Sequence, residues 1–209
     1  AFNYGGPPIG FDGFLQSAPY PTAVVTGIGG LIDSISISIT WHKKDGGTEY
    51  QCDLADGGAR AFNEEVSFSI KSPFGKIVEL VRTGDYGTGT VTSGQVTTIF
   101  SNYGSALIGD PLPISGSFKA AGDLSVYENE VAQGDWTLIA NDAETLDPLC
   151  IIDFAVIIKT KQVSANSEIF WYSDITLNDL LTSNDSLAIQ TSILGKNSYY
   201  AVAQCEGLC

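Results

Sequence analysis

The sequence contains no methionine and only one histidine, and it has 10 lysines and arginines against 24 aspartates and glutamates. Its formal net charge is −14 at pH 7. Because phosphate groups are bound by clustered lysine and arginine side chains, this balance disfavours nucleic acid as a partner, and anionic membrane surfaces for the same reason. Acidic surfaces instead favour solubility and calcium binding.

Long apolar runs and helical periodicity are also missing. No stretch approaches the roughly 20 apolar residues that a membrane-spanning helix needs, so we expect no membrane insertion. The opening residues 1–4 lack the charged region of a signal peptide, and we therefore expect the chain to be an excised or mature piece of a longer protein. Glycine, serine and threonine are frequent. This composition predicts an all-β protein, with one domain or one domain plus a fragment.

Features of catalytic centres are scarce. The sequence has no Cys-x-x-Cys pair, which together with the single histidine, His42, disfavours a zinc site. His42 stands beside Lys43 and Lys44 at the end of an expected strand, and no Gly-x-Ser-x-Gly motif is present, so we interpret it as a surface histidine. No pair of carboxylates stands out from the acidic surface as a glycosidase site. We expect no enzymatic activity.

Alternating residues predict the main strands. Ile35, Ile37, Ile39 and Trp41 alternate with serine and threonine, as in a strand with one buried face. A second strand is expected over 136–140, and the apolar, β-branched run 151–158 predicts a strand buried on both faces. These last two strands, closed by the acidic loop between them, predict the core of an antiparallel β-sandwich.

Two motifs resemble a known family. The residues Val66 to Leu80 form a strand, a Ser-Pro-x-Gly turn and a second strand, and Gly134-x-Trp136-x-Leu138 precedes a short acidic loop and a hydrophobic strand. In this order they resemble the P-domain found beside subtilisin-like proprotein convertases, over roughly residues 5–160. The resemblance implies a jelly-roll-like β-sandwich without catalytic residues of its own.

The chain changes character at residues 159–165, where apolar residues give way to polar ones. We place a domain boundary there, between a sandwich at 1–160 and a small β module at 161–209. The module's expected strands lie at 168–172, 180–181, 187–189 and 198–203. It resembles the second half of the immunoglobulin-like repeats of large secreted Bacteroidetes surface proteins. Such short strands are marginal alone, so we expect the module to pack on the first domain or to continue in a neighbour.

The four cysteines allow three disulfide pairings. We favour Cys52–Cys150 and Cys205–Cys209, because the first two fall within the expected sandwich and the last two are close in sequence. Four buried free thiols stay open as the alternative. Disulfides would indicate an oxidising, extracellular or cell-surface location.

Calcium is the expected cofactor. It takes six to eight oxygen ligands, often from aspartates and loop carbonyls, and two acidic loops offer them. The candidate ligands are Asp53 and Asp56 in one loop, and Asp142, Glu144 and Asp147 in the other. A Cys52–Cys150 bridge would bring the two loops together. The alternative is that these acids only accept hydrogen bonds within turns.

Aromatic residues and one serine suggest contacts with sugars. Six aromatics would suit a glycan-binding face, although alternation predicts that most of them are core: Trp41, Trp136, Trp171, Tyr172, Tyr199 and Tyr200. Ser186, within Asp185-Ser186-Leu187, resembles the sites at which Bacteroidetes attach O-linked glycans.

Together these observations predict a calcium-stabilised, non-catalytic module of a large cell-surface or secreted protein, of the adhesin class carried by type IX secretion. Its partners would be neighbouring domains of the same protein and a glycan or surface ligand. The alternative is the accessory C-terminal module of a secreted subtilisin-like protease or polysaccharide hydrolase.

Overall fold

The computed structural model describes residues 1–13, 15–16, 18–44, 52, 61–87, 90–91, 94–106, 114–161, 167–183, 186–188 and 198–205. The chain divides into two compact units, Ala1–Gln162 and Val163–Cys209, close to the boundary expected at residue 160. Among the described residues, no helix has the length and apolar character needed to cross a membrane.

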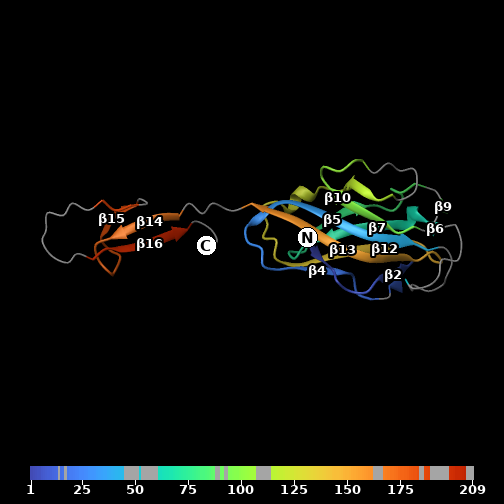
Figure 1. Ribbon diagram of the computed structural model, residues 1–209, viewed down its shortest axis with the longest axis horizontal. Coiled ribbons are helices and arrows are strands. Elements are labelled where there is room, and N and C mark those ends of the chain that lie inside the picture. The colour runs from blue at the N-terminus through green and yellow to red at the C-terminus, as the bar shows by residue number, and fades with distance from the viewer. Residues whose placement is uncertain are drawn as a thin grey trace. The chain divides into compact units, whose positions relative to one another are not determined.

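The first unit contains two main β-sheets (Figure 1). The larger sheet runs in the order β11 (Gly116–Lys119), β10 (Val96–Ser101), β5 (Leu31–Lys43), β13 (Leu149–Lys161), β2 (Ile9–Asp12) and β3 (Leu15–Gln16), with β1 (Phe2–Asn3) also paired to β13. The smaller sheet runs β4 (Thr22–Val25), β12 (Gly134–Asp142), β7 (Val66–Lys71) and β8 (Ile77–Val81). Only the β10–β11 pair is parallel among the described strand pairs.

Short elements complete this unit. A two-stranded ribbon joins β6 (Ala61–Phe62) to β9 (Thr90–Val91). The 3₁₀ turns η1 (Asn63–Glu65) and η2 (Leu124–Tyr127) are its only helical elements within the described residues. The all-β sandwich expected from the sequence is therefore confirmed.

The core lies between the two sheets. Ile37, Ile39 and Trp41 of β5 are fully buried, as are Phe68 and Ile70 of β7. The rings of Trp41 and Phe68 meet edge to face with centroids 5.4 Å apart, so the two layers interlock across the sandwich. The inward set of β5 is the one that alternation predicts.

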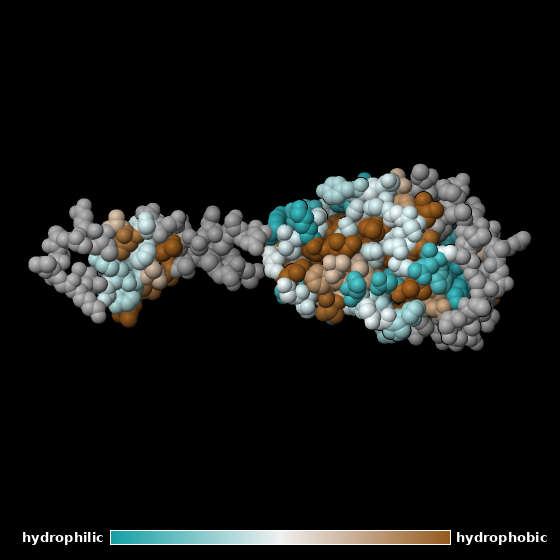
Figure 2. Space-filling model, in the orientation of Figure 1, coloured by the Kyte–Doolittle hydropathy of each residue, from teal (hydrophilic) through white to brown (hydrophobic). Residues whose placement is uncertain are grey.

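The outer face of the larger sheet carries both polar and apolar residues. Strands β5 and β13 cross the front of the unit in Figure 1, and Figure 2 shows pale residues interleaved with brown ones on that side. The expectation that β13 is buried on both faces holds in part. Phe154 and its two successors are buried, whereas Asp153 and Ile157 are exposed. The central strand therefore has one face that is only partly covered.

The β7–β8 hairpin forms as its turn residues predict. The Gly75 N–H donates to the Ser72 carbonyl at 2.9 Å, which closes a four-residue turn with Pro73 at its second position. Gly75 has φ 85°, a conformation that favours glycine.

The N-terminal segment contains three short strands, β1, β2 and β3, that were not predicted from the sequence. Of these, β2 pairs with β13, and its residues Ile9 and Phe11 are buried. Pro7 and Pro8 stand directly before β2, and prolines, which lack an N–H, are a sequence signal against a strand. β2 lies near one edge of the larger sheet, since only β3 lies beyond it.

The second unit is a three-stranded antiparallel sheet. Its central strand is β14 (Ser167–Tyr172), flanked by β15 (Leu180–Ser183) and β16 (Tyr200–Cys205). These overlap three of the four expected strands. The fourth was expected at 187–189. Its first two residues are described but lie outside any strand, and the third lies outside the described residues.

Candidate functional site: a buried charge cluster

One lysine and two carboxylates meet inside one end of the sandwich. Lys43 is the last residue of β5, Asp142 is the last residue of β12, and Glu65 ends the 3₁₀ turn before β7. The cluster therefore joins Lys43 of the larger sheet to Asp142 of the smaller sheet, with Glu65 contributed by the turn that leads into β7.

Lys43 is drawn inward by the register of β5. It is two residues beyond Trp41, in phase with the buried isoleucines, and only 1% of its side chain is exposed. Its Nζ donates to Asp142 Oδ1 at 2.9 Å, to the Phe62 carbonyl at 3.1 Å, and to the Glu65 carboxylate. A buried ammonium is tolerated only when it is paired and hydrogen-bonded in this way.

Asp142 is the most deeply enclosed acid of the cluster. Its side chain has no solvent exposure, and its Oδ2 accepts a hydrogen bond from the Leu149 N–H at 3.1 Å. Burial raises the pKa of Asp142 to about 7, against the opposing pull of Lys43 and with a smaller raising effect from Glu65. Two carboxylates thus share one ammonium, and the excess negative charge favours keeping a proton on Asp142.

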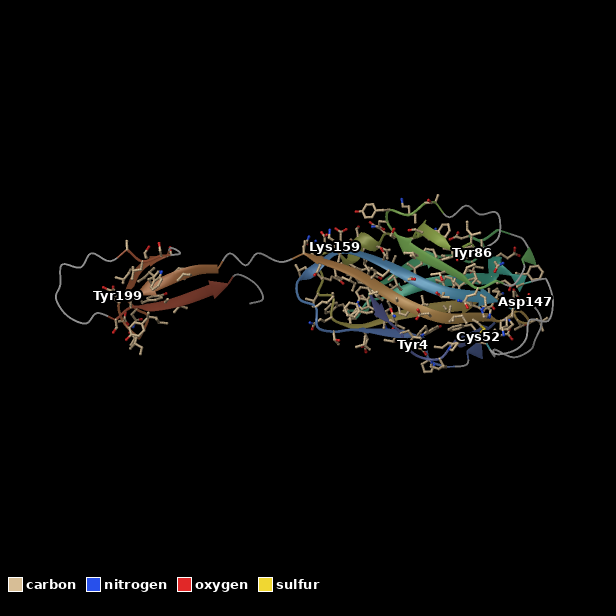
Figure 3. The ribbon with its side chains drawn as sticks, in the orientation of Figure 1. Tyr4, Cys52, Tyr86, Asp147, Lys159 and Tyr199 are labelled. Carbon is tan, nitrogen blue, oxygen red and sulfur yellow. A yellow bond between two sulfur atoms is a disulfide. The ribbon has the colours of Figure 1, made fainter. Side chains whose placement is uncertain are left out.

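The Cys52–Cys150 disulfide closes the same end of the sandwich. The two Cα atoms are 5.5 Å apart and the bridged residues are 98 positions apart in the sequence. Cys150 is fully buried and pairs in register with His42, the neighbour of Lys43. Figure 3 shows Cys52 and Asp147 at this end and Lys159 at the other. The bridge is the one favoured from the sequence.

The loop 143–148 is held by backbone contacts. The Lys44 N–H donates to the Pro148 carbonyl at 3.0 Å, and the Leu146 N–H donates to Asp12 Oδ1 at 2.8 Å. Asp12 itself is almost fully buried. The loop that joins the two sheets therefore has a fixed path.

The proposed calcium ligands separate into three kinds. Asp142 was expected in a loop, but it closes strand β12, and both of its oxygens are engaged by Lys43 and the Leu149 N–H. Glu144 is exposed and Asp147 is buried. Asp53 and Asp56 lie outside the described residues. Within the part of the chain that the structure describes, no three histidine, cysteine or acidic side chains gather as a metal site.

Other candidates fall in varied places. Trp41 and Trp136 are fully buried core residues, so neither belongs to a sugar-binding face. Trp171, Tyr172, Tyr199 and Tyr200 are half-buried in the second unit. Ser186 is exposed, which suits modification. The Cys205 side chain and Cys209 lie outside the described residues, so their pairing stays a prediction.

The roles of Lys43 and Glu65 were not predicted from the sequence. His42, interpreted as a surface residue, is half-buried within β5. A signal for Lys43 was present: the buried series at every second residue from Ile35 to Trp41 continues onto it. A lysine in phase with a buried set predicts a buried acid as its partner. Nothing comparable marks Glu65, whose role depends on where η1 lies.

No protein-family model, curated protein or solved structure matches the chain. The resemblance to the P-domain and to immunoglobulin-like repeats thus stays a prediction from short motifs. Function must be inferred from the chain's own residues. Chemically, the charge cluster offers a buried amine, a carboxyl group at hydrogen-bond distance from it, and a second carboxylate beside both.

Proposed function

We propose that the chain is a non-catalytic β-sandwich module of a larger secreted or cell-surface protein. The observation that carries this proposal is the Cys52–Cys150 disulfide. It fastens a long connection to the central strand β13, and its buried Cys150 is shielded from reductants. Structural disulfides persist in oxidising compartments and are rare in reducing ones.

The second unit supports a modular role. None of its described residues is buried, and large apolar side chains such as Ile175 and Leu180 are exposed by 73% and 50%. A sheet of three short strands with so little burial needs a covering surface to be stable. Neighbouring domains of the same protein are the partners that we propose for it.

The finer assignment is to the adhesin class carried by type IX secretion, with a glycan or other surface ligand. It rests on the resemblance of the second unit to immunoglobulin-like surface repeats. The half-buried Trp171, Tyr172 and Tyr200 leave part of each ring accessible for such a ligand.

Surface proteolysis of intact producing cells tests the location. Brief trypsin treatment should release peptides of this chain together with known surface proteins, while a cytosolic marker stays intact. Non-reducing peptide mapping of the same material should recover Cys52 joined to Cys150. The proposal fails if peptides appear only after lysis and both cysteines are recovered as free thiols.

A further inference from the structure

We infer that Lys43 and Asp142 are placed to form an intramolecular isopeptide bond, with Glu65 as the proton-transfer group. The Lys43 Nζ lies 2.9 Å from Asp142 Oδ1, and 1% and 0% of the two side chains are exposed. Amine and carboxyl group are thus held together in a site from which water is nearly excluded. This inference goes beyond the proposed module role and does not depend on it.

Fixed geometry removes the main obstacle to amide formation. Two groups held in near-attack positions react as if at a very high local concentration, with effective molarities of about 10⁵–10⁸ M in well-oriented systems. Both strands that carry the groups are anchored here: Lys43 pairs in register with Leu149, and Asp142 with Val66. The reacting atoms therefore cannot drift apart as exposed side chains would.

The neighbours of the pair match the needs of acyl transfer. The Leu149 N–H holds Asp142 Oδ2 and would stabilise the negative charge that develops on this oxygen in a tetrahedral intermediate. The Phe62 carbonyl accepts from Lys43 Nζ at 3.1 Å and orients the amine. The Glu65 carboxylate contacts the same Nζ and is in reach to take its proton.

The step balances without any co-reactant. A proton passes from the Lys43 ammonium to Asp142, which gives a neutral amine and a neutral carboxylic acid; burial favours this uncharged pair. The amine nitrogen then bonds to Asp142 Cγ. Glu65 takes a proton from that nitrogen and delivers it to Oδ1, and the Cγ–Oδ1 bond breaks to release one water molecule. Oδ2 becomes the amide oxygen, and Glu65 ends as a carboxylate.

The bond would tie the two layers of the sandwich together. Lys43 belongs to the larger sheet and Asp142 to the smaller one, 99 residues further along the chain. The disulfide does not make this connection, because Cys150 lies in β13 of the same sheet as Lys43. The disulfide therefore attaches Cys52 to the larger sheet, whereas the amide would join the larger sheet to the smaller one.

Mass spectrometry of the intact full chain tests the inference directly. After reduction and alkylation of the cysteines, the protein should weigh one water molecule less than the mass calculated for the fully alkylated sequence. Protease digestion should then yield a branched peptide in which the Lys43 side chain is joined to the Asp142 side chain. A succinimide would also remove a water, but it would give no branched peptide.

Three variants sharpen the result. Lys43→Arg keeps the charge and should restore the full mass. Glu65→Gln keeps the shape and should slow the loss of water after refolding by roughly a hundredfold or more. Lys159→Arg, at an exposed ion pair with Asp33, is the matched control and should lose the water as the parent chain does.

The mass and the peptide map of the unaltered chain decide whether the bond forms, so the test stays valid even if a variant fails to fold. Loss of one water with a branched Lys43–Asp142 peptide supports the bond. A full mass after prolonged incubation at neutral pH, or a lowered mass without the branched peptide, overturns it and leaves a buried ion pair.

Discussion

The two units treat charge and apolar surface in opposite ways. The sandwich encloses Lys43 and Asp142 between its sheets and buries a large apolar core around them. In the second unit, no described residue is buried, and Asp179 is exposed. The loop 173–179, for example, winds around the exposed carboxylate of Asp174, which accepts from the N–H groups of Thr176 and Asp179 at 2.8 Å each.

The aspartates show what the difference means physically. Burial raises the pKa of Asp142 to about 7, whereas hydrogen bonds, first of all from the Thr176 side chain, lower the pKa of Asp174. The same side chain is therefore driven toward its neutral form in one unit and held in its charged form in the other. The buried group can affect stability and reactivity, while the exposed one mainly shapes a turn.

Separating the units should produce the largest effect. A chain of residues 163–209 buries too little surface to fold alone, so its circular dichroism should lack a cooperative thermal transition. A chain of residues 1–162 should keep a cooperative transition close to that of the whole protein. A cooperative transition in the isolated second unit would remove the contrast between the two.

The fold of the sandwich could be predicted because the residue pattern within a strand shows which of its side chains are buried. In β5 each isoleucine alternates with a serine or threonine, and in the hairpin Pro73 and Gly75 mark the turn. Strand β2 could not be predicted in this way, since its four residues are all buried and its burial does not alternate. The second unit was located from the change from apolar to polar residues at 159–165.

The site could be predicted less well than the fold, because it depends on which strand ends lie together in the tertiary structure. The disulfide was inferred from the position of Cys150, but the acid partner of Lys43 was not. Asp142 comes from the other sheet, and no local pattern announces a contact over 99 residues. The acidic residues that follow Asp142 in the sequence suggested a calcium-binding loop, whereas in the structure Asp142 pairs with Lys43.

Removing the lysine from the buried cluster should cost more than removing a lysine at the surface. Compared with freshly folded protein in which no amide has formed, Lys43→Met leaves Asp142 and Glu65 without their ammonium partner. The loss of one partner of a buried pair typically costs about 3–5 kcal/mol of unfolding free energy. Lys159→Met breaks only an exposed pair with Asp33 and should cost about 0–1 kcal/mol. Urea denaturation of both variants measures the difference. Equal losses of unfolding free energy in the two variants would mean that the buried cluster stabilises the fold no more than an exposed ion pair does.

Side-chain titration by carbon-13 NMR should separate the two aspartates. Asp174 should titrate below 3.8, the ordinary pKa of an aspartate, so its contribution to stability is present above that pH and is lost on acidification through its lowered pKa. Asp142 in freshly folded, unlinked protein should titrate near 7, so its contribution is present below 3.8 and is lost as pH rises through 7.

The same spectra report on the proposed bond. Once an amide has formed between Lys43 and Asp142, the Asp142 side-chain carbon should no longer move with pH. An Asp142 signal that titrates below 4 in unlinked protein would contradict the raised pKa and the shared-ammonium arrangement. Asp174 serves as the internal standard in every sample, since its environment lies outside the cluster.

Calcium should have the smallest effect, because the structure has already assigned Asp142 to Lys43. The remaining candidates are Asp147, Glu144, Asp53 and Asp56, so binding would be weak. At a tenfold excess over Kd, a cation that binds only the folded chain adds about 1.4 kcal/mol. That should raise the melting temperature by roughly 3–6 °C for a protein of this size. Asp147→Asn should reduce the shift, whereas Asp174→Asn in the second unit should leave it unchanged. Superimposable melting curves in chelator and in millimolar calcium would show that the acids of this end serve the fold alone.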